Sequence, residues 1–134
     1  MRTWEVRGSR ARCLLPLAVV VCAVGVGCGR RNSPGDAPLA RQSLTAALES
    51  WKAGDAPTKI RDNTPPIVMV DPAWDKGQKL ESFEIVGPEV DDGTNLVCPV
   101  KLVVDDPRGK LTAEVKYIVG TSPKITIFRH RSSY

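Results

Sequence analysis

The chain carries little of the chemistry on which enzymes commonly rely. Its only histidine, His130, lies among the last five of 134 residues, beside Arg129 and Arg131. A Ser-His-Asp or Cys-His arrangement would have to use this one imidazole, and a position so close to the end of a chain is usually solvated. The sequence therefore predicts no catalytic site and no cofactor.

Cysteine is equally scarce where it could act. Of four cysteines, Cys13, Cys22 and Cys28 fall in the first 28 residues, so that Cys98 is alone in the remainder. A domain with one cysteine forms no internal disulfide and offers no cysteine pair to a metal. The clustered aspartates after residue 88 do not follow the twelve-residue calcium-loop pattern and are better explained as turn residues. We therefore expect no metal site.

Nucleic acid is not an expected partner. The seven aromatic residues are scattered, so they form no platform for base stacking. The net charge of +4 comes mostly from residues 1–27, which hold four arginines and one glutamate; the rest has 15 basic and 14 acidic residues. No glycine-rich loop joins a strand to a helix in the way that phosphate binding requires.

The N-terminal segment has the pattern of an export signal. No charged residue occurs from Cys13 to Cys28, four arginines precede this run, and a polar stretch with glycine and proline follows it. A basic start, a short apolar run and small residues at its end are typical of a secretory signal. The run has 16 residues and contains Pro16, whereas a membrane-spanning helix needs about 20 apolar residues.

The end of this run, Gly25-Val26-Gly27-Cys28, resembles the lipobox of bacterial lipoprotein precursors. The resemblance implies cleavage before Cys28, with Gly25, Val26 and Gly27 as the cleavage context, and lipidation of Cys28. Gly27 fits the motif, while Gly25 stands where the family usually has leucine. Plain secretory cleavage is the second interpretation and an uncleaved anchor the third. The first interpretation predicts an exported protein held at a membrane by lipid, in the periplasm or at the cell surface.

The chain divides into four parts on this interpretation. We expect a signal peptide over residues 1–27, a lipidated cysteine and flexible tether over 28–37, one α+β domain over 38–130 and a tail over 131–134. The 107 residues that remain after cleavage suffice for a single hydrophobic core.

One segment after the tether has the periodicity of an amphipathic helix. Asp36 is suited to cap it, Pro38 to its first turn and Gly54 to its end. Apolar residues recur at steps of three and four, which is typical of a helix with one buried face: Ala40, Leu44, Ala47, Leu48 and Trp51. We expect Trp51 to be a core residue.

Two short strands are expected after this helix, over residues 67–70 and 80–86, with Phe83 and Ile85 on one face. The segments around them are rich in proline, glycine or acidic residues and are expected to be loops or turns: 56–66, 73–78 and 89–93.

The last third of the domain alternates most regularly. It predicts an antiparallel meander of three strands, with a turn at Asp106–Gly109. Because opposed residues share a face, the phase predicts the following neighbours: Val104 with Leu111, Val100 with Val115, Cys98 with Tyr117, and Tyr117 with Ile127. A buried Cys98 thiol would then behave as a small hydrophobic group.

The opposite face of this meander is not fully polar. Four apolar residues project there among lysines and threonines: Val97, Val103, Ile118 and Phe128. Partial exposure is common on sheets and explains such residues. A contact surface or a shallow pocket is the alternative interpretation, and these four residues are the candidate contact face.

An α+β fold with one N-terminal amphipathic helix packed on a curved antiparallel sheet of four to five strands resembles the cystatin-like and nuclear transport factor 2-like folds. The resemblance covers about Pro38 to Arg129 and rests on the order of the elements. Cystatin inhibitors carry a Gln-x-Val-x-Gly loop and a later Pro-Trp turn. The nearest stretch here, Phe83–Gly87, lacks the glutamine, and no Pro-Trp pair occurs.

Enzymes of the second fold use acid and base side chains inside a conical cavity. Tyr117 is the one interior polar residue that the phase identifies, and a backbone partner is expected for its hydroxyl. An enzyme would need a carboxylate such as Asp71, Asp75 or Glu84 to point into an enclosed pocket.

These observations predict a lipid-anchored extracytoplasmic binding or assembly module of the bacterial cell envelope, without a catalytic site. Its partners would be the membrane, through the lipid, and another envelope protein or a small ligand. A small cavity-containing enzyme of the nuclear transport factor 2-like fold and a secreted, non-lipidated binding domain are the alternatives.

Overall fold

The computed structural model describes residues 35–131 of the chain. The predicted signal peptide, most of the tether and the last three residues lie outside this range. The lipidation site Cys28 and its cleavage context, Gly25, Val26 and Gly27, are therefore outside the described residues. Between residues 35 and 131, no helix is both long enough and apolar enough to cross a bilayer.

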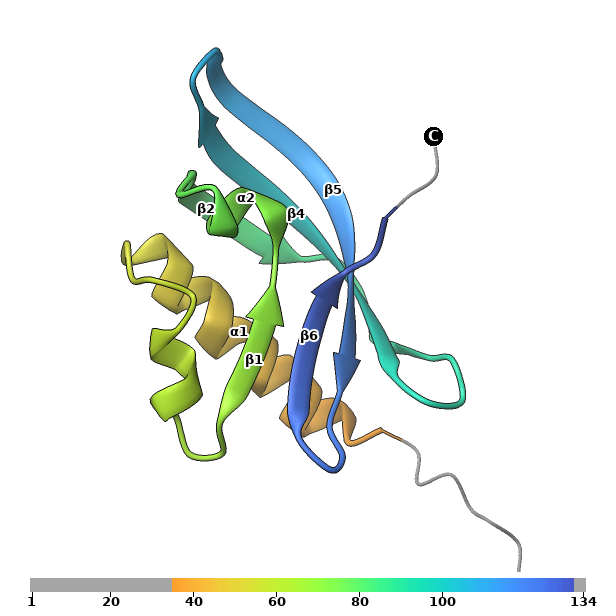
Figure 1. Cartoon of the computed structure of the whole chain (residues 1–134). Coiled ribbons are helices and arrows are strands. Elements are labelled where there is room, and N and C mark those ends of the chain that lie inside the picture. Colours follow the sequence, from red (N-terminus) through yellow and green to blue (C-terminus); the bar gives the residue numbers. More distant parts are fainter. Residues whose placement is uncertain (1–34, 132–134) are drawn as a thin grey trace, which may run out of the picture.

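The described part is an α+β fold in which a curled, mixed sheet packs against one long helix, α1 (Figure 1). In chain order the elements are α1 (Ala37–Lys52), η1 (Lys59–Asp62), β1 (Ile67–Val70), α2 (Pro72–Asp75), β2 (Lys79–Ile85), β3 (Val90–Asp91), β4 (Leu96–Asp106), β5 (Gly109–Gly120) and β6 (Ile125–Arg129). The strands are ordered β1-β6-β5-β4-β2, and the short β3 also pairs with β4.

Helix α1 begins and ends where its capping residues predict. The Asp36 carboxylate accepts a hydrogen bond from the Leu39 backbone N–H at 3.0 Å, and Pro38 lies in the first turn, where its missing N–H costs nothing. Past the last helical residue, Gly54 adopts a positive φ of 87°. The whole predicted apolar stripe is buried: Ala40, Leu44, Ala47, Leu48 and Trp51. The prediction for α1 is confirmed.

Two segments expected to be loops or turns contain short helices that bury apolar side chains. Residues 56–66 include η1, whose Ile60 is buried. Residues 72–75 form α2, which the Asp71 side chain caps, and Trp74 of α2 is buried. Both predictions were too simple because one or two buried side chains on a single helical turn leave no periodicity to detect.

The buried Trp74 ring stacks on Trp51 of α1. Their ring centroids are 5.6 Å apart and the planes differ by 13°. Each indole N–H reaches a backbone carbonyl, Trp51 that of Gln78 at 2.7 Å and Trp74 that of Asp55 at 2.8 Å. The pair therefore brings large apolar area into the core without leaving an indole donor unsatisfied.

The register of the long β4–β5 hairpin is the predicted one. Val104 pairs with Leu111, Val100 with Val115 and Cys98 with Tyr117. The next pairing was predicted wrongly: Ile127 pairs with Val119, and Tyr117 pairs with Arg129. The shift is two residues, so each side chain stays on its predicted face. It arises because the connection between Gly120 and Ile125 is longer than a tight turn.

The expected antiparallel sheet of four to five strands was wrong in two respects, because the sheet is mixed and has six strands. Strand β1 pairs with β6 in parallel, from Ile67 opposite Ile125 to Val70 opposite Phe128, so the sheet is mixed. It also includes the two-residue β3, where an acidic loop was expected. Alternation within a strand identifies its buried face but does not identify its neighbour, and β1 lies more than 50 residues from β6.

The packing of α1 against the sheet leads to a prediction about stability. Leu44 is completely buried, whereas Leu111 is 56% exposed. We expect Leu44→Ala to lower the free energy of unfolding by about 2–5 kcal/mol through lost burial and a residual cavity. The matched control Leu111→Ala should cost less than about 1 kcal/mol. Chemical denaturation measures both, and equal losses would contradict this packing.

Candidate functional site

The outer face of the sheet, opposite α1, carries a row of apolar side chains in register. Val97 pairs with Val90 of β3 and with Ile118 of β5, Ile118 pairs with Phe128 of β6, and Phe128 pairs with Val70 of β1. Paired residues project to the same face of a sheet. These five side chains, from five adjacent strands, are called the outer row below.

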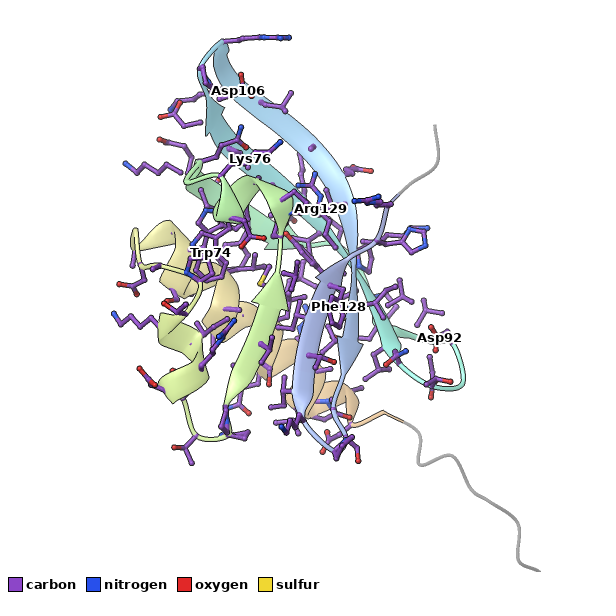
Figure 2. The ribbon with its side chains drawn as sticks, in the orientation of Figure 1. Trp74, Lys76, Asp92, Asp106, Phe128 and Arg129 are labelled. Atoms are coloured by element: carbon purple, nitrogen blue, oxygen red, sulfur yellow. The ribbon has the colours of Figure 1, made fainter. Side chains whose placement is uncertain are left out.

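Three of the five side chains in the outer row are exposed. Val90 is 59% exposed, Phe128 45% and Val70 43%. Val97 and Ile118, in the middle of the row, are half-buried. Figure 2 labels Phe128 on β6. Single exposed apolar residues are common, but a contiguous set marks a candidate contact surface.

The structure brings together three of the four residues predicted for the contact face. Val97, Ile118 and Phe128 belong to the outer row, whereas Val103 does not. Val103 pairs with Thr112, six residues farther along β4, which is about 20 Å away at the rise of a strand. The sequence analysis missed Val70 and Val90. Phe128, the neighbour of Val70 across the sheet, is distant in sequence, and Val90 itself lies on a strand too short to recognise.

A buried polar cluster lies on the inner side of the sheet and centres on Asp71, which has no exposed surface. The Tyr117 hydroxyl donates to Oδ2 of Asp71 at 2.6 Å, and Oδ1 accepts from the Ala73 backbone N–H at 2.8 Å. Nη1 of Arg129 is 3.5 Å from the same Oδ1. The expected backbone partner for Tyr117 was therefore wrong. Its partner is the Asp71 carboxylate, and the alternation of residues along one strand does not show which distant residue lies beside Tyr117.

Burial is the main cause of the raised pKa values of Tyr117 and Cys98. It raises the pKa of the Tyr117 hydroxyl far above its ordinary value, and the negative charge of Asp71 raises it further. Burial also raises the pKa of the Cys98 thiol to about 11, with a smaller contribution from Glu89. Cys98 therefore stays a neutral thiol at physiological pH, as expected of a core residue rather than a nucleophile.

A cleft of about 440 Å³ opens between the end of β6 and the middle of β5. Its walls are Val70, Pro72, Ala113, Glu114, Val115, Phe128, Arg129, His130 and Arg131. The Asp71 and Tyr117 side chains do not line it. His130 is exposed, but its backbone N–H donates to the Lys116 carbonyl at 2.7 Å, so it extends the β5–β6 pairing by one bond.

The three carboxylates that would favour an enzyme do not face an enclosed pocket. Asp71 is buried and fully engaged, whereas Asp75 and Glu84 are exposed. Within the part of the chain that the structure describes, no three histidine, cysteine or acidic side chains gather as metal ligands would. Comparison of the chain with protein-family models, with curated proteins and with solved structures finds no match.

The Asp71–Tyr117 bond generates a prediction with a pH signature. At neutral pH, Tyr117→Phe should lower the free energy of unfolding by about 1–3 kcal/mol, because Oδ2 of buried Asp71 loses its donor. The raised pKa of Tyr117 stabilises the fold fully below its unfolded pKa of about 10, and that contribution is lost as pH rises above it.

Above about pH 10, the free energy of unfolding of the wild type should therefore fall more steeply with pH than that of Tyr117→Phe. The difference in slope should be up to about 1.4 kcal/mol per pH unit. Urea denaturation at several alkaline pH values measures the difference. Cys98 also titrates in this range, but it is present in both proteins and cancels. Equal slopes would show that Tyr117 is not held protonated by the fold.

Proposed function

We propose that this chain is an exported, lipid-anchored module of the bacterial cell envelope that binds another protein through the outer row. The observation that carries the binding role is the register of Val90, Val97, Ile118, Phe128 and Val70 across five adjacent strands. The lipobox resemblance of Gly25 to Cys28 supports the anchor. Stable anchoring takes more than one acyl chain, and the domain then needs no membrane contact of its own.

The dimensions of the outer row favour a protein over a small ligand. Five strands at about 4.8 Å spacing give a row about 19 Å long. Val70 and Phe128 at one end of the row border the cleft, but Val90, Val97 and Ile118 do not line it. Most of the row therefore lies on an open face of the sheet, whereas small-molecule sites are concave. The next register position holds the polar side chains of Lys116 and His130 beside the apolar Pro99. An apolar centre with a polar rim is the usual composition of a protein–protein contact.

The finer fold assignment that we propose is cystatin-like, because one long helix precedes a curled sheet whose long hairpin dominates. The proposal includes no catalytic step. Asp71 is occupied by internal donors, and the cleft beside Arg129 has a single carboxylate on its walls, that of Glu114. A cavity-containing enzyme is therefore the less well supported alternative.

Lipidation is tested by intact mass spectrometry of the protein purified from membranes, beside a Cys28→Ser variant. We expect the wild-type mass to correspond to a chain that begins at Cys28 and carries acyl chains. The variant should lose the modification. An unmodified wild-type chain that begins at another residue would reject the anchor, and it would leave the binding proposal to be judged separately.

Binding through the outer row is tested by photo-cross-linking in cells. A photoreactive residue in place of exposed Val90 should give one discrete product with a second protein. The same residue in place of Ser82, which is exposed and lies across from the excluded Val103, should not. Adding Phe128→Asp to the Val90 derivative should lower the yield about tenfold, because a buried charge weakens an apolar contact.

Two results would contradict this proposal. Equal yields from positions 90 and 82 would show that contact is not confined to the outer row. A yield from position 90 that Phe128→Asp leaves unchanged would show that the row is not a single surface. Circular dichroism should show a folded Phe128→Asp variant, since Phe128 is an exposed side chain.

A further inference from the structure

Half of β5 has a backbone edge that no other described strand covers. Strand β5 runs over residues 109–120, but β6 pairs only with residues 117–120. Within residues 35–131, the pairing on that side ends with the hydrogen bond from the His130 N–H to the Lys116 carbonyl, at 2.7 Å. Residues 109–115 of β5 are therefore paired on one side only, with β4.

The hydrogen bond from His130 to Lys116 also shows which way the unpaired backbone groups of β5 point. The Lys116 carbonyl faces the β6 side, and in an antiparallel pair the peptide groups of every second residue face the same way. The N–H and C=O groups of Lys110, Thr112 and Glu114 therefore point away from β4. An exposed row of such groups is a template for another strand.

This edge lies on a projecting arm, the part of the β4–β5 hairpin that extends past β6 and ends at the Asp106–Gly109 turn. Figure 1 shows the hairpin reaching well beyond β6, and Figure 2 shows Asp106 near its tip. On the other side of the hairpin, β2 pairs with β4 as far as Asp105. A second chain can therefore approach the edge without displacing α1 or β1.

The edge is complementary to itself. If a second copy lies antiparallel with Thr112 on the two-fold axis, Lys110 faces the partner's Glu114 and Glu114 faces the partner's Lys110. Paired residues share a face, so each lysine lies directly beside a carboxylate of opposite charge. The same register brings exposed Leu111, on the other face, against the partner's Ala113.

The cleft next to the edge fits the same arrangement. Antiparallel pairing about Thr112 carries the partner's turn to the region beyond Val115, where the cleft opens. The arm tip carries Asp106 and Arg108, and behind them Asp105 pairs with Lys110, so its charges balance. The far wall of the cleft carries Arg129, His130 and Arg131.

We propose that two copies of this chain join edge to edge through residues 109–115 of β5, so that their sheets become one across a two-fold axis at Thr112. Seven residues give about 24 Å of strand, a smaller contact than most permanent dimers use. The dimer therefore forms reversibly and depends on concentration. The paired edge, residues 109–115, contains no residue of the outer row, although Val70 and Phe128 border the adjoining cleft. Thr112→Pro changes the edge alone, so it separates this proposal from binding through the outer row.

Charge reversal tests the register. Sedimentation velocity of the purified full-length chain, in detergent where it is lipidated, should show a concentration-dependent dimer. Lys110→Glu and Glu114→Lys should each raise the dimer dissociation constant about tenfold, because each change puts like charges face to face twice. The double variant restores opposite charges and should return to within about threefold of wild type.

Thr112→Pro tests the edge itself. The Thr112 N–H faces away from β4, so proline there removes no internal ladder bond, yet it blocks pairing of the edge. The matched Thr112→Val keeps the N–H and should dimerise as wild type does. Thermal unfolding of each variant controls for folding, since Lys110 also contacts Glu81 at 3.2 Å within the chain.

Several outcomes would overturn the proposal. A wild-type chain that stays monomeric at every concentration would show that the edge does not recruit a second copy, even if it accepts another protein. A dimer that survives Thr112→Pro would place the contact elsewhere. A dimer lost in Phe128→Asp but retained in Thr112→Pro would assign self-association to the outer row. Failure of the double variant to recover would reject the pairing of Lys110 with Glu114.

Discussion

The hydrogen bond between Tyr117 and Asp71 is the interaction on which the arrangement of the sheet depends. It joins residues 46 positions apart, one on the long hairpin and the other at the end of β1. A carboxylate without exposed surface is tolerable only if its oxygens are satisfied. Asp71 meets this condition through Tyr117, the first backbone N–H groups of α2 and Arg129. Four elements are thereby held at one point: β1, α2, β5 and β6.

The position of the tryptophan pair follows from this cluster. Asp71 caps α2, α2 carries Trp74, and Trp74 stacks on Trp51 of α1. The capping carboxylate thus connects the polar cluster to the apolar core through a helix of only four residues. Removal of the carboxylate would leave a tyrosine hydroxyl, two backbone donors and an arginine without their partner. These contacts offset the cost of burying the carboxylate.

Local features of the fold were predictable from the sequence, and the long-range ones were not. The caps and stripe of α1 and the register from Cys98–Tyr117 to Val104–Leu111 all depend on residues that lie close together along the chain. The parallel pairing of β1 with β6 and the partner of Tyr117 depend on which distant segments meet. The outer row shows both cases. Val97, Ile118 and Phe128 were found by alternation. Val103 lies on the same face but six residues farther along β4, and Val70 and Val90 were identifiable only once the strand order was known.

The arm and the start of α1 lie at opposite ends of the domain (Figure 1). The chain enters the domain at the lower end of α1, next to the β5–β6 connection, where the Asp36 N–H donates to Thr121, and the arm tip projects from the opposite end (Figure 1). A lipid on Cys28 would hold the entry end near the bilayer and direct the arm tips outward. Antiparallel pairing about Thr112 points the partner's arm the opposite way, so the two entry ends would lie at opposite ends of the joined sheet. Two copies anchored in one bilayer with both arms outward would present parallel edges, so edge pairing at a membrane requires the arms to lie along its surface.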